Sequence, residues 1–264
     1  MIGDTYPKFR AGVVHASPVF LDREATIDKL GKIANKAKEQ GADIVIFPES
    51  FVPAFPLWCI VYAPIDQHDF YRRLFDNSVL IPGPAFSRLA DIAKSQKIFL
   101  SVGVTEKSDY SMGAMWNTNL LFDRNGALIN RHRKIMPTWA EKLIWALGDG
   151  SQLRPAKTEI GNIGTLICGE NTNPICRYAL LAQGEQVRIS TWKDSELGRQ
   201  ISKIPSGRRR KAPPAAGIPF GSGFGRTNSR NRSRFSAGPA SGSFKPKIGK
   251  TKRNSGGIFH GLCD

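Results

Sequence analysis

The sequence contains little cysteine or histidine and has no long hydrophobic run. The 4 cysteines (Cys59, Cys168, Cys176 and Cys263) form no Cys-X-X-Cys pair and no close cluster with any of the 4 histidines. This spacing argues against a zinc site and against a disulfide framework. No apolar run approaches the roughly 18 residues of a membrane-spanning helix, and residues 1–7 lack a signal-peptide core. We therefore expect a cytoplasmic protein without a structural metal.

Acidic residues are scarce in the C-terminal part of the chain. Residues 193–264 contain 16 Lys and Arg but only 3 Asp and Glu, which leaves 22 basic and 19 acidic residues in 1–192. The segment 193–264 is rich in Gly, Ser and Arg and has no helical or strand period, so we expect a disordered basic tail. Aromatic residues lie between its cations, and binding to nucleic acid or another acidic partner is therefore one hypothesis for it: Phe220, Phe224, Phe235 and Phe244.

Residues 1–192, in contrast, have the pattern of a layered α/β domain. Apolar residues recur at helical spacing within 22–40, and Gly41 ends this predicted helix. The continuous apolar run Asp43–Phe47 is typical of a strand buried on both faces. Arg124-Asn125-Gly126 predicts a hairpin turn. Further strands are predicted over 9–16, 98–105, 116–123, 127–130, 158–161, 162–167 and 187–192, and helices over 69–75, 85–95, 139–147 and 175–183.

Three reactive side chains follow predicted strands. Glu49 comes after Asp43–Phe47, Lys134 comes after the strand over 127–130, and Cys168 comes after the strand over 162–167. Because ligands of layered α/β domains bind just past strand ends, we expect these side chains to gather at one edge. Glu49 could take the proton of the Cys168 thiol, and the Lys134 ammonium could favour the thiolate. The ammonium and the backbone N–H of Gly169 could both stabilise the anion formed after attack.

Each residue also has a structural interpretation. A cysteine after a buried strand is often a small core residue, a carboxylate there is often part of a solvated turn, and Lys134 lies in a basic run. We interpret Cys176 as a core residue and Glu170 as a side chain that ties down the turn after Cys168. A Cys–His protease site would need one of four histidines, none of which lies in a supporting motif: His15, His68, His132 and His260.

Three ordered motifs make this chain resemble the nitrilase branch of the carbon–nitrogen hydrolase superfamily. They are Phe47-Pro48-Glu49-Ser50-Phe51, His132-Arg133-Lys134-Ile135-Met136-Pro137-Thr138 and Leu166-Ile167-Cys168-Gly169-Glu170-Asn171. The resemblance covers about Phe9 to Trp192. It implies a four-layer α-β-β-α sandwich, a homo-oligomer, and chemistry that needs no cofactor and no metal.

The resemblance also implies a catalytic triad of Glu49, Lys134 and Cys168, with Glu141 as a second glutamate in the site. Cys168 would attack a nitrile carbon to give a thioimidate, and two waters would then release ammonia and a carboxylic acid by way of a thioester. Nitrile or cyanide hydration and amide hydrolysis are alternatives on the same triad. We expect three residues to bind the substrate: Gly169, Trp139 and Pro53. Many relatives carry Trp where this chain has Gly169, so the size of the substrate stays open.

The resemblance ends where the composition changes. The family domain continues past a strand such as 187–192 with a helix and further strands, whereas this chain continues into the basic segment. We therefore expect a carbon–nitrogen hydrolase domain over 1–192 that lacks its C-terminal part, and a basic tail over 193–264. The sequence would then be truncated or frame-shifted after about Trp192. The alternative function is an inactive homologue whose basic tail binds acidic partners.

Overall fold

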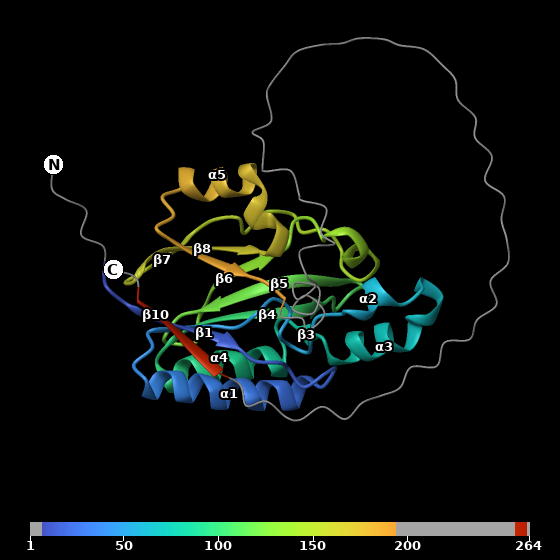
Figure 1. Ribbon diagram of the computed structural model, residues 1–264, viewed down its shortest axis with the longest axis horizontal. Helices are drawn as coiled ribbons and strands as arrows, with labels where there is room; N and C mark the ends of the chain where they lie inside the picture. The colour runs from blue at the N-terminus through green and yellow to red at the C-terminus, as the bar shows by residue number, and fades with distance from the viewer. Residues whose placement is uncertain (1–6, 194–256, 263–264) are drawn as a thin grey trace, which may run out of the picture. The chain divides into compact units, whose positions relative to one another are not determined.

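The computed structural model describes residues 7–193 and 257–262, which fold into two β-sheets with helices on both sides (Figure 1). The larger sheet has the strand order β10-β1-β2-β4-β5-β6, and β3 pairs with β4. Strands β1, β2 and β4 are parallel to one another, while β5 and β6 continue the sheet as antiparallel neighbours. The bounds are β1 Arg10–His15, β2 Ile44–Ile46, β3 Val79–Leu80, β4 Phe99–Lys107, β5 Met115–Phe122, β6 Leu128–Arg133 and β10 Gly257–Leu262.

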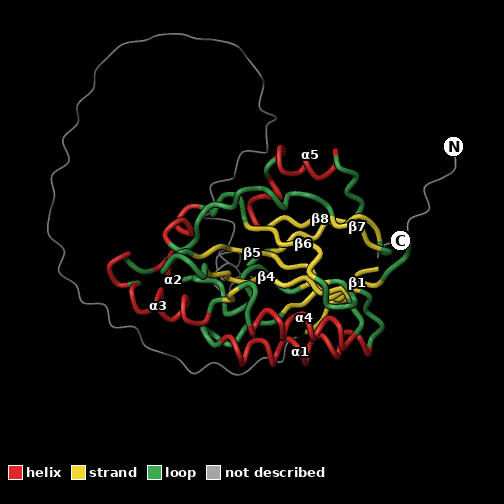
Figure 2. The backbone as a smooth tube through the Cα atoms, turned by 180° about the vertical axis from the view of Figure 1, so that it is seen from behind, coloured by secondary structure: helices red, strands yellow, loops and turns green. Residues whose placement is uncertain are grey.

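Two helices, α1 (Arg23–Glu39) and α4 (Pro84–Gln96), cover one face of the larger sheet, as Figures 1 and 2 show from opposite sides. The apolar stripe predicted within 22–40 packs there: Leu30 is fully buried and belongs to the same core as Leu89 and Leu100. The Asp22 side chain accepts the N–H of Ala25 at 3.0 Å and so caps the start of α1.

The smaller sheet packs on the other face. Its strands β7 (Ala156–Thr158), β8 (Gly161–Ile167) and β9 (Val187–Thr191) lie in the order β7-β8-β9. Side chains of both sheets form one apolar cluster: Ile44, Phe99, Leu121, Ile160, Ile163 and Ile189. Helix α5 (Pro174–Ala182) packs Cys176 and Leu180 on Leu166 of β8. The layers are therefore helix, sheet, sheet and helix, which confirms the predicted α/β sandwich, and Cys176 is a core residue as interpreted.

A third packed region lies at one end of the sandwich. It contains α2 (Trp58–Val61), η1 (Pro64–Asp66), α3 (His68–Asn77) and the short 3₁₀ helix η2 (Trp139–Leu143). Leu74 of α3 is fully buried in its apolar cluster. The rings of Phe55 and Trp145 meet edge to face, with centroids 5.4 Å apart. This region carries Glu141 of η2 toward the ends of the strands.

One prediction was correct in kind and too long, and another was wrong. The short helix expected over 139–147 is present as η2 but ends at Leu143, and the N–H of Ile144 donates to the Glu141 carbonyl at 2.9 Å. The expected absence of strands after 193 fails at β10, which pairs antiparallel with β1. Main-chain pairing to an edge strand needs no side-chain period, so composition does not reveal it. The rest of the predicted tail, 194–256 and 263–264, lies outside the described residues.

Candidate active site

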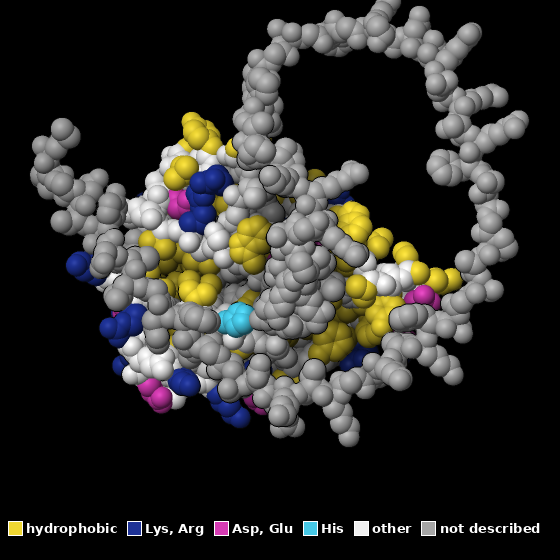
Figure 3. Space-filling model, viewed as in Figure 1, with side chains coloured by type: hydrophobic (Ala, Val, Ile, Leu, Met, Phe, Trp, Pro, Cys, Tyr) yellow, Lys and Arg dark blue, Asp and Glu magenta, His cyan; other side chains and the backbone are white. Residues whose placement is uncertain are grey.

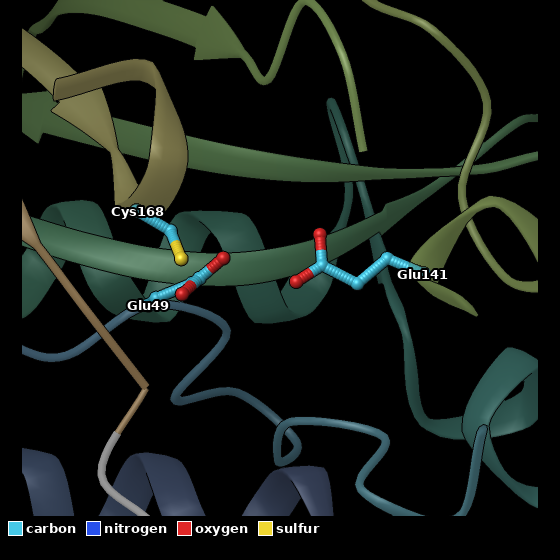
Figure 4. Close-up of side chains that lie close together, drawn as sticks. All are labelled: Glu49, Glu141 and Cys168. Atoms are coloured by element: carbon cyan, nitrogen blue, oxygen red, sulfur yellow. The ribbon is translucent and has the colours of Figure 1, made fainter. Parts of the chain in front are cut away.

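The structure brings the three residues that follow predicted strands into one buried cluster. Glu49 follows β2, Lys134 follows β6, and Cys168 follows β8 as the first residue of the 3₁₀ helix η3 (Cys168–Thr172). The Cys168 sulfur and carboxylate oxygens of Glu49 and Glu141 lie within 4.8 Å of one another, and Figure 4 shows these three side chains converging. The Lys134 Nζ lies 2.9 Å from Glu49 Oε1 and 2.7 Å from Glu141 Oε2. All four residues are buried.

Glu49 is fixed by neighbours from several segments. Its Oε1 accepts the Asn117 side-chain amide of β5 at 2.8 Å, and its Oε2 accepts the backbone N–H of Lys193 at 3.0 Å. Its own N–H donates to the Trp192 carbonyl at 3.3 Å. Strand β4 passes so close that a Cβ on Gly103 would lie 2.3 Å from the Pro48 carbonyl oxygen. A side chain at position 103 would therefore displace the segment that carries Glu49.

Lys134 and Glu141 are held in the same way. The N–H of Lys134 donates to the Asn117 carbonyl at 2.8 Å, which continues the contact of β6 with β5. A Cβ on Gly148 would lie 2.4 Å from the Arg133 carbonyl oxygen, so only glycine allows this close passage. Glu141 Oε2 accepts the N–H of Thr138 at 2.8 Å as well as the Lys134 ammonium. The second glutamate is therefore fixed by both its own helix and the lysine.

Backbone strain is concentrated around the cluster. Cys168 has φ 50°, and Ser50 and Trp139, which lie beside the cluster in sequence, have φ 47° and φ 48°. A non-glycine residue in this left-handed region costs about 1–3 kcal/mol and persists where its surroundings hold it, often at functional sites. The turn after Cys168 is held by Glu170, whose Oε2 accepts the N–H of Ile167 at 2.9 Å, as interpreted from the sequence.

Burial and the two carboxylates keep the Cys168 thiol protonated. Burial raises the pKa of Cys168 to about 11, and the charges of Glu49 and Glu141 add to this, while Lys134 and the Gly169 amide act in the opposite direction. Lys134 thus favours the thiolate, as expected from the sequence, but burial and the two carboxylates outweigh it. Burial also raises the pKa of Glu49, which makes it a stronger base. Burial disfavours the Lys134 ammonium, but Glu49 and Glu141 outweigh it and raise the pKa of Lys134.

The same cluster has the spacing of a metal site. A thiol and two carboxylates with ligand atoms within 4.8 Å could hold a metal ion. However, the Lys134 ammonium already donates to both carboxylates, at 2.9 Å and 2.7 Å. The chain thus supplies its own cation between Glu49 and Glu141, and their charges do not require a metal.

A cavity of about 390 Å³ lies beside the nucleophile turn. Gly169 and Trp139, two of the residues predicted to bind substrate, line it together with Thr138 and Lys142. Trp139 is 75% exposed, so its indole stands at the surface of this cavity. Pro53, the third predicted residue, does not line it: Pro53 is buried, and its carbonyl accepts the N–H of Leu21 at 3.2 Å.

Three residues of the site were not predicted from the sequence: Asn117, Gly103 and Gly148. Asn117 could have been found, because it is a polar residue in a strand, β5, whose residues are all buried. A buried amide needs partners, and here its partner is Glu49. The two glycines carry no such signal, since their role is the close approach of chain segments distant in sequence.

This chain is similar to known proteins in sequence and in fold. The family model described as carbon–nitrogen hydrolase matches residues 10–206, past the boundary predicted at Trp192. A nitrilase of Bacillus sp. (strain OxB-1) is 42% identical over 187 residues, which is 71% of this chain and 54% of the relative. A bifunctional nitrilase/nitrile hydratase of Nicotiana tabacum is 37% identical over 194 residues, 72% of this chain and 55% of the relative. The chain thus spans about half the length of these relatives.

Among solved structures, a carbon–nitrogen hydrolase from Helicobacter pylori G27 has the same fold. It matches with a TM-score of 0.57 and 18% sequence identity, and the match covers 74% of this chain and 67% of that one. The order of layers in Figure 1 therefore recurs in an independently determined structure.

Proposed function

The chain belongs to the carbon–nitrogen hydrolase family, and we propose that it hydrolyses a nitrile to a carboxylic acid and ammonia, with Cys168 as the nucleophile. The observation that carries this proposal is the buried cluster of one thiol, one ammonium and two carboxylates. Supporting it, the relatives from Bacillus and Nicotiana are both named nitrilases. Because the chain spans about half of their length, the activity is inferred for this chain rather than carried over.

In the first half of the reaction the Cys168 thiol transfers its proton to Glu49 as the sulfur attacks the nitrile carbon. The raised pKa of Glu49 suits it to accept this proton, and the raised pKa of Cys168 makes a base necessary. The nitrile nitrogen takes up the proton, and the product is a thioimidate. Lys134, fixed between Glu49 and Glu141, stabilises the negative charge that develops on the nitrogen.

In the second half water completes the hydrolysis. Glu49 accepts a proton from a water molecule as it adds to the thioimidate carbon and passes that proton to the nitrogen. The hydroxyl of the tetrahedral intermediate then gives up its proton as ammonia leaves, and a thioester remains. A second water then attacks the thioester and releases the carboxylic acid and the free thiol. Glu141 acts in both halves by holding the Lys134 ammonium at 2.7 Å.

A second candidate is hydration that stops at the amide. The Nicotiana relative is named a bifunctional nitrilase/nitrile hydratase, so this outcome fits the same family. It would follow if the tetrahedral intermediate lost the Cys168 sulfur in place of ammonia. Hydrolysis of an amide on the same residues is the third interpretation of the cluster.

A panel of aliphatic and aromatic nitriles and the matching amides tests these alternatives. For the full chain we expect ammonia and acid from at least one nitrile, and loss of both with Cys168→Ala. The matched control is Cys59→Ala, which removes a buried thiol of α2 from its apolar cluster and should keep the activity. Amide product without ammonia would establish hydration, and ammonia from amides alone would establish an amidase. Equal turnover by Cys168→Ala and the unchanged chain would refute the proposal.

We also propose that the protein is cytoplasmic and forms homo-oligomers. The cysteines Cys59, Cys168 and Cys176 are free thiols, which suits a reducing compartment such as the cytoplasm.

The support for an oligomer is an exposed apolar surface. Apolar side chains lie exposed on α5, namely Ile175, Tyr178 and Leu181, and Figure 3 shows apolar surface over this helix. In the described part of the chain no helix is long and apolar enough to cross a membrane. Nucleic-acid binding by the basic tail stays a prediction.

A further inference from the structure

The Glu170 carboxylate joins the two segments that carry the nucleophile and the lysine. Its Oε2 accepts the N–H of Ile167, the residue before Cys168, at 2.9 Å. Its Oε1 accepts the N–H of Ile135, the residue after Lys134, at 2.7 Å. One side chain thus bonds the main chain directly beside both groups, across 35 residues of sequence.

His132 completes this arrangement from the lysine side. Its Nε2 lies 2.8 Å from Glu170 Oε2, and His132 is 1% exposed. It stands two residues before Lys134 on β6, so Glu170 is bonded to β6 on one side of Lys134 and to the following residue on the other.

The charge state of Glu170 makes these bonds strong. Burial alone would raise the pKa of this carboxyl, but His132 and the two backbone amides outweigh burial and lower it. Glu170 is therefore ionised, and bonds to an ionised acceptor are shorter and stronger than neutral ones. Glu170 is not among the charged groups that act on the Cys168 thiol, which are Glu49, Lys134 and Glu141.

We propose that Glu170 and His132 are positioning residues that set the distance between the Cys168 sulfur and the Lys134 ammonium. This inference rests on the proposed role of Cys168 as nucleophile. Neither side chain donates or accepts a proton in the reaction. They join β6 of the larger sheet to β8 of the smaller sheet, and each of these strands is followed by a reacting group, Lys134 or Cys168.

The test uses the full chain and needs no knowledge of the substrate. The alkylation rate of each cysteine by iodoacetamide is followed by peptide mass spectrometry across a range of pH. The variants are Glu170→Gln, in which the amide offers one acceptor for three donors, His132→Leu, which removes one donor, and His132→Gln, which restores a donor near the position of Nε2. The control is Glu185→Gln, which alters a buried carboxylate paired with Arg188 away from the cluster. Thermal unfolding gives the folded fraction of each protein.

We expect the pH midpoint of Cys168 alkylation to rise in Glu170→Gln and His132→Leu, because Lys134 then stabilises the thiolate less. His132→Gln and Glu185→Gln should keep the midpoint. With an active nitrile, kcat should fall by about 10²-fold in Glu170→Gln at nearly constant KM, as for a displacement of about 1 Å. A merely structural role would lower the folded fraction and leave the midpoint unchanged.

The failures of the two proposals are distinguishable. If Cys168→Ala keeps the nitrile turnover of the unchanged chain, the nucleophile assignment fails and this inference fails with it. If Cys168→Ala abolishes turnover and the midpoint of Cys168 alkylation is the same in Glu170→Gln as in the unchanged chain, only the positioning role is overturned. If Glu170→Gln does not fold, the variants His132→Leu and His132→Gln provide the test. The inference is overturned if Cys168 alkylation has the same pH profile in His132→Leu as in the unchanged chain.

Discussion

Replacing Lys134 with methionine should destabilise the protein strongly and in a pH-dependent manner. The Lys134 side chain is buried and lies 2.9 Å from Glu49 and 2.7 Å from Glu141. Methionine has a similar volume but leaves two carboxylates buried near each other without their cation. Breaking a buried ion pair by removing one partner costs about 3–5 kcal/mol, so we expect a loss of unfolding free energy of that size near neutral pH.

The pH dependence follows from the protons bound in each state. Burial raises the pKa of Glu49 in the folded chain, and loss of the Lys134 charge, which opposes this, raises it further. A carboxyl whose folded pKa exceeds its unfolded pKa favours folding below the unfolded value and loses this contribution as the pH rises through the folded value. The penalty of Lys134→Met should therefore be largest above the raised pKa of Glu49 and shrink as the pH falls through it.

Urea unfolding followed by circular dichroism, repeated at several pH values, measures this penalty. The control is Lys142→Met, which changes an exposed lysine on the same short helix η2 and should shift the unfolding free energy by less than about 0.5 kcal/mol. A penalty for Lys134→Met below about 1 kcal/mol, or one that does not change between neutral and acid pH, would refute the electrostatic reasoning.

Three further predictions concern single residues. Asp22→Ala removes the N-cap of α1 and should cost about 1 kcal/mol of unfolding free energy without altering Cys168 alkylation. Glu49→Gln should reduce ammonia release by about 10²–10⁴-fold through loss of the base. Urea unfolding should show an unchanged or higher stability, because the raised pKa of Glu49 means that its charged form is less favourable in the folded chain than in the unfolded one. Gly169→Trp should fill part of the cavity of about 390 Å³, so turnover of bulky nitriles should fall more than that of small ones. A Cβ at position 169 would lie 3.3 Å from Thr138 Oγ1, so Thr138 has to shift slightly.

The sequence predicted which residues meet but not how their charges balance. Glu49, Lys134 and Cys168 were predictable because each follows a strand with a strong local pattern. The net shift in the pKa of Cys168 was not predictable, since it depends on burial and on two carboxylates whose distances are set by the packing of two sheets.

Other contacts escaped prediction for related reasons. The backbone N–H of Lys193 bonds to Glu49 at 3.0 Å, and such main-chain contacts leave no trace in residue type. The strand β10 was not predicted for the same reason, because it pairs with β1 through the backbone. Side-chain patterns thus predicted the elements of residues 9–192 well, whereas contacts between distant main-chain segments required the structure.

The proposed site is divided between the two sheets. Glu49, Asn117 and Lys134 belong to the larger sheet or follow its strands, whereas Cys168 and Lys193 follow strands of the smaller one. Neither sheet alone therefore holds the complete cluster around Cys168. The reactivity of Cys168 can then serve as a reporter of sheet docking: during refolding it should reach its native value only in the step that joins the sheets, later than the formation of either sheet.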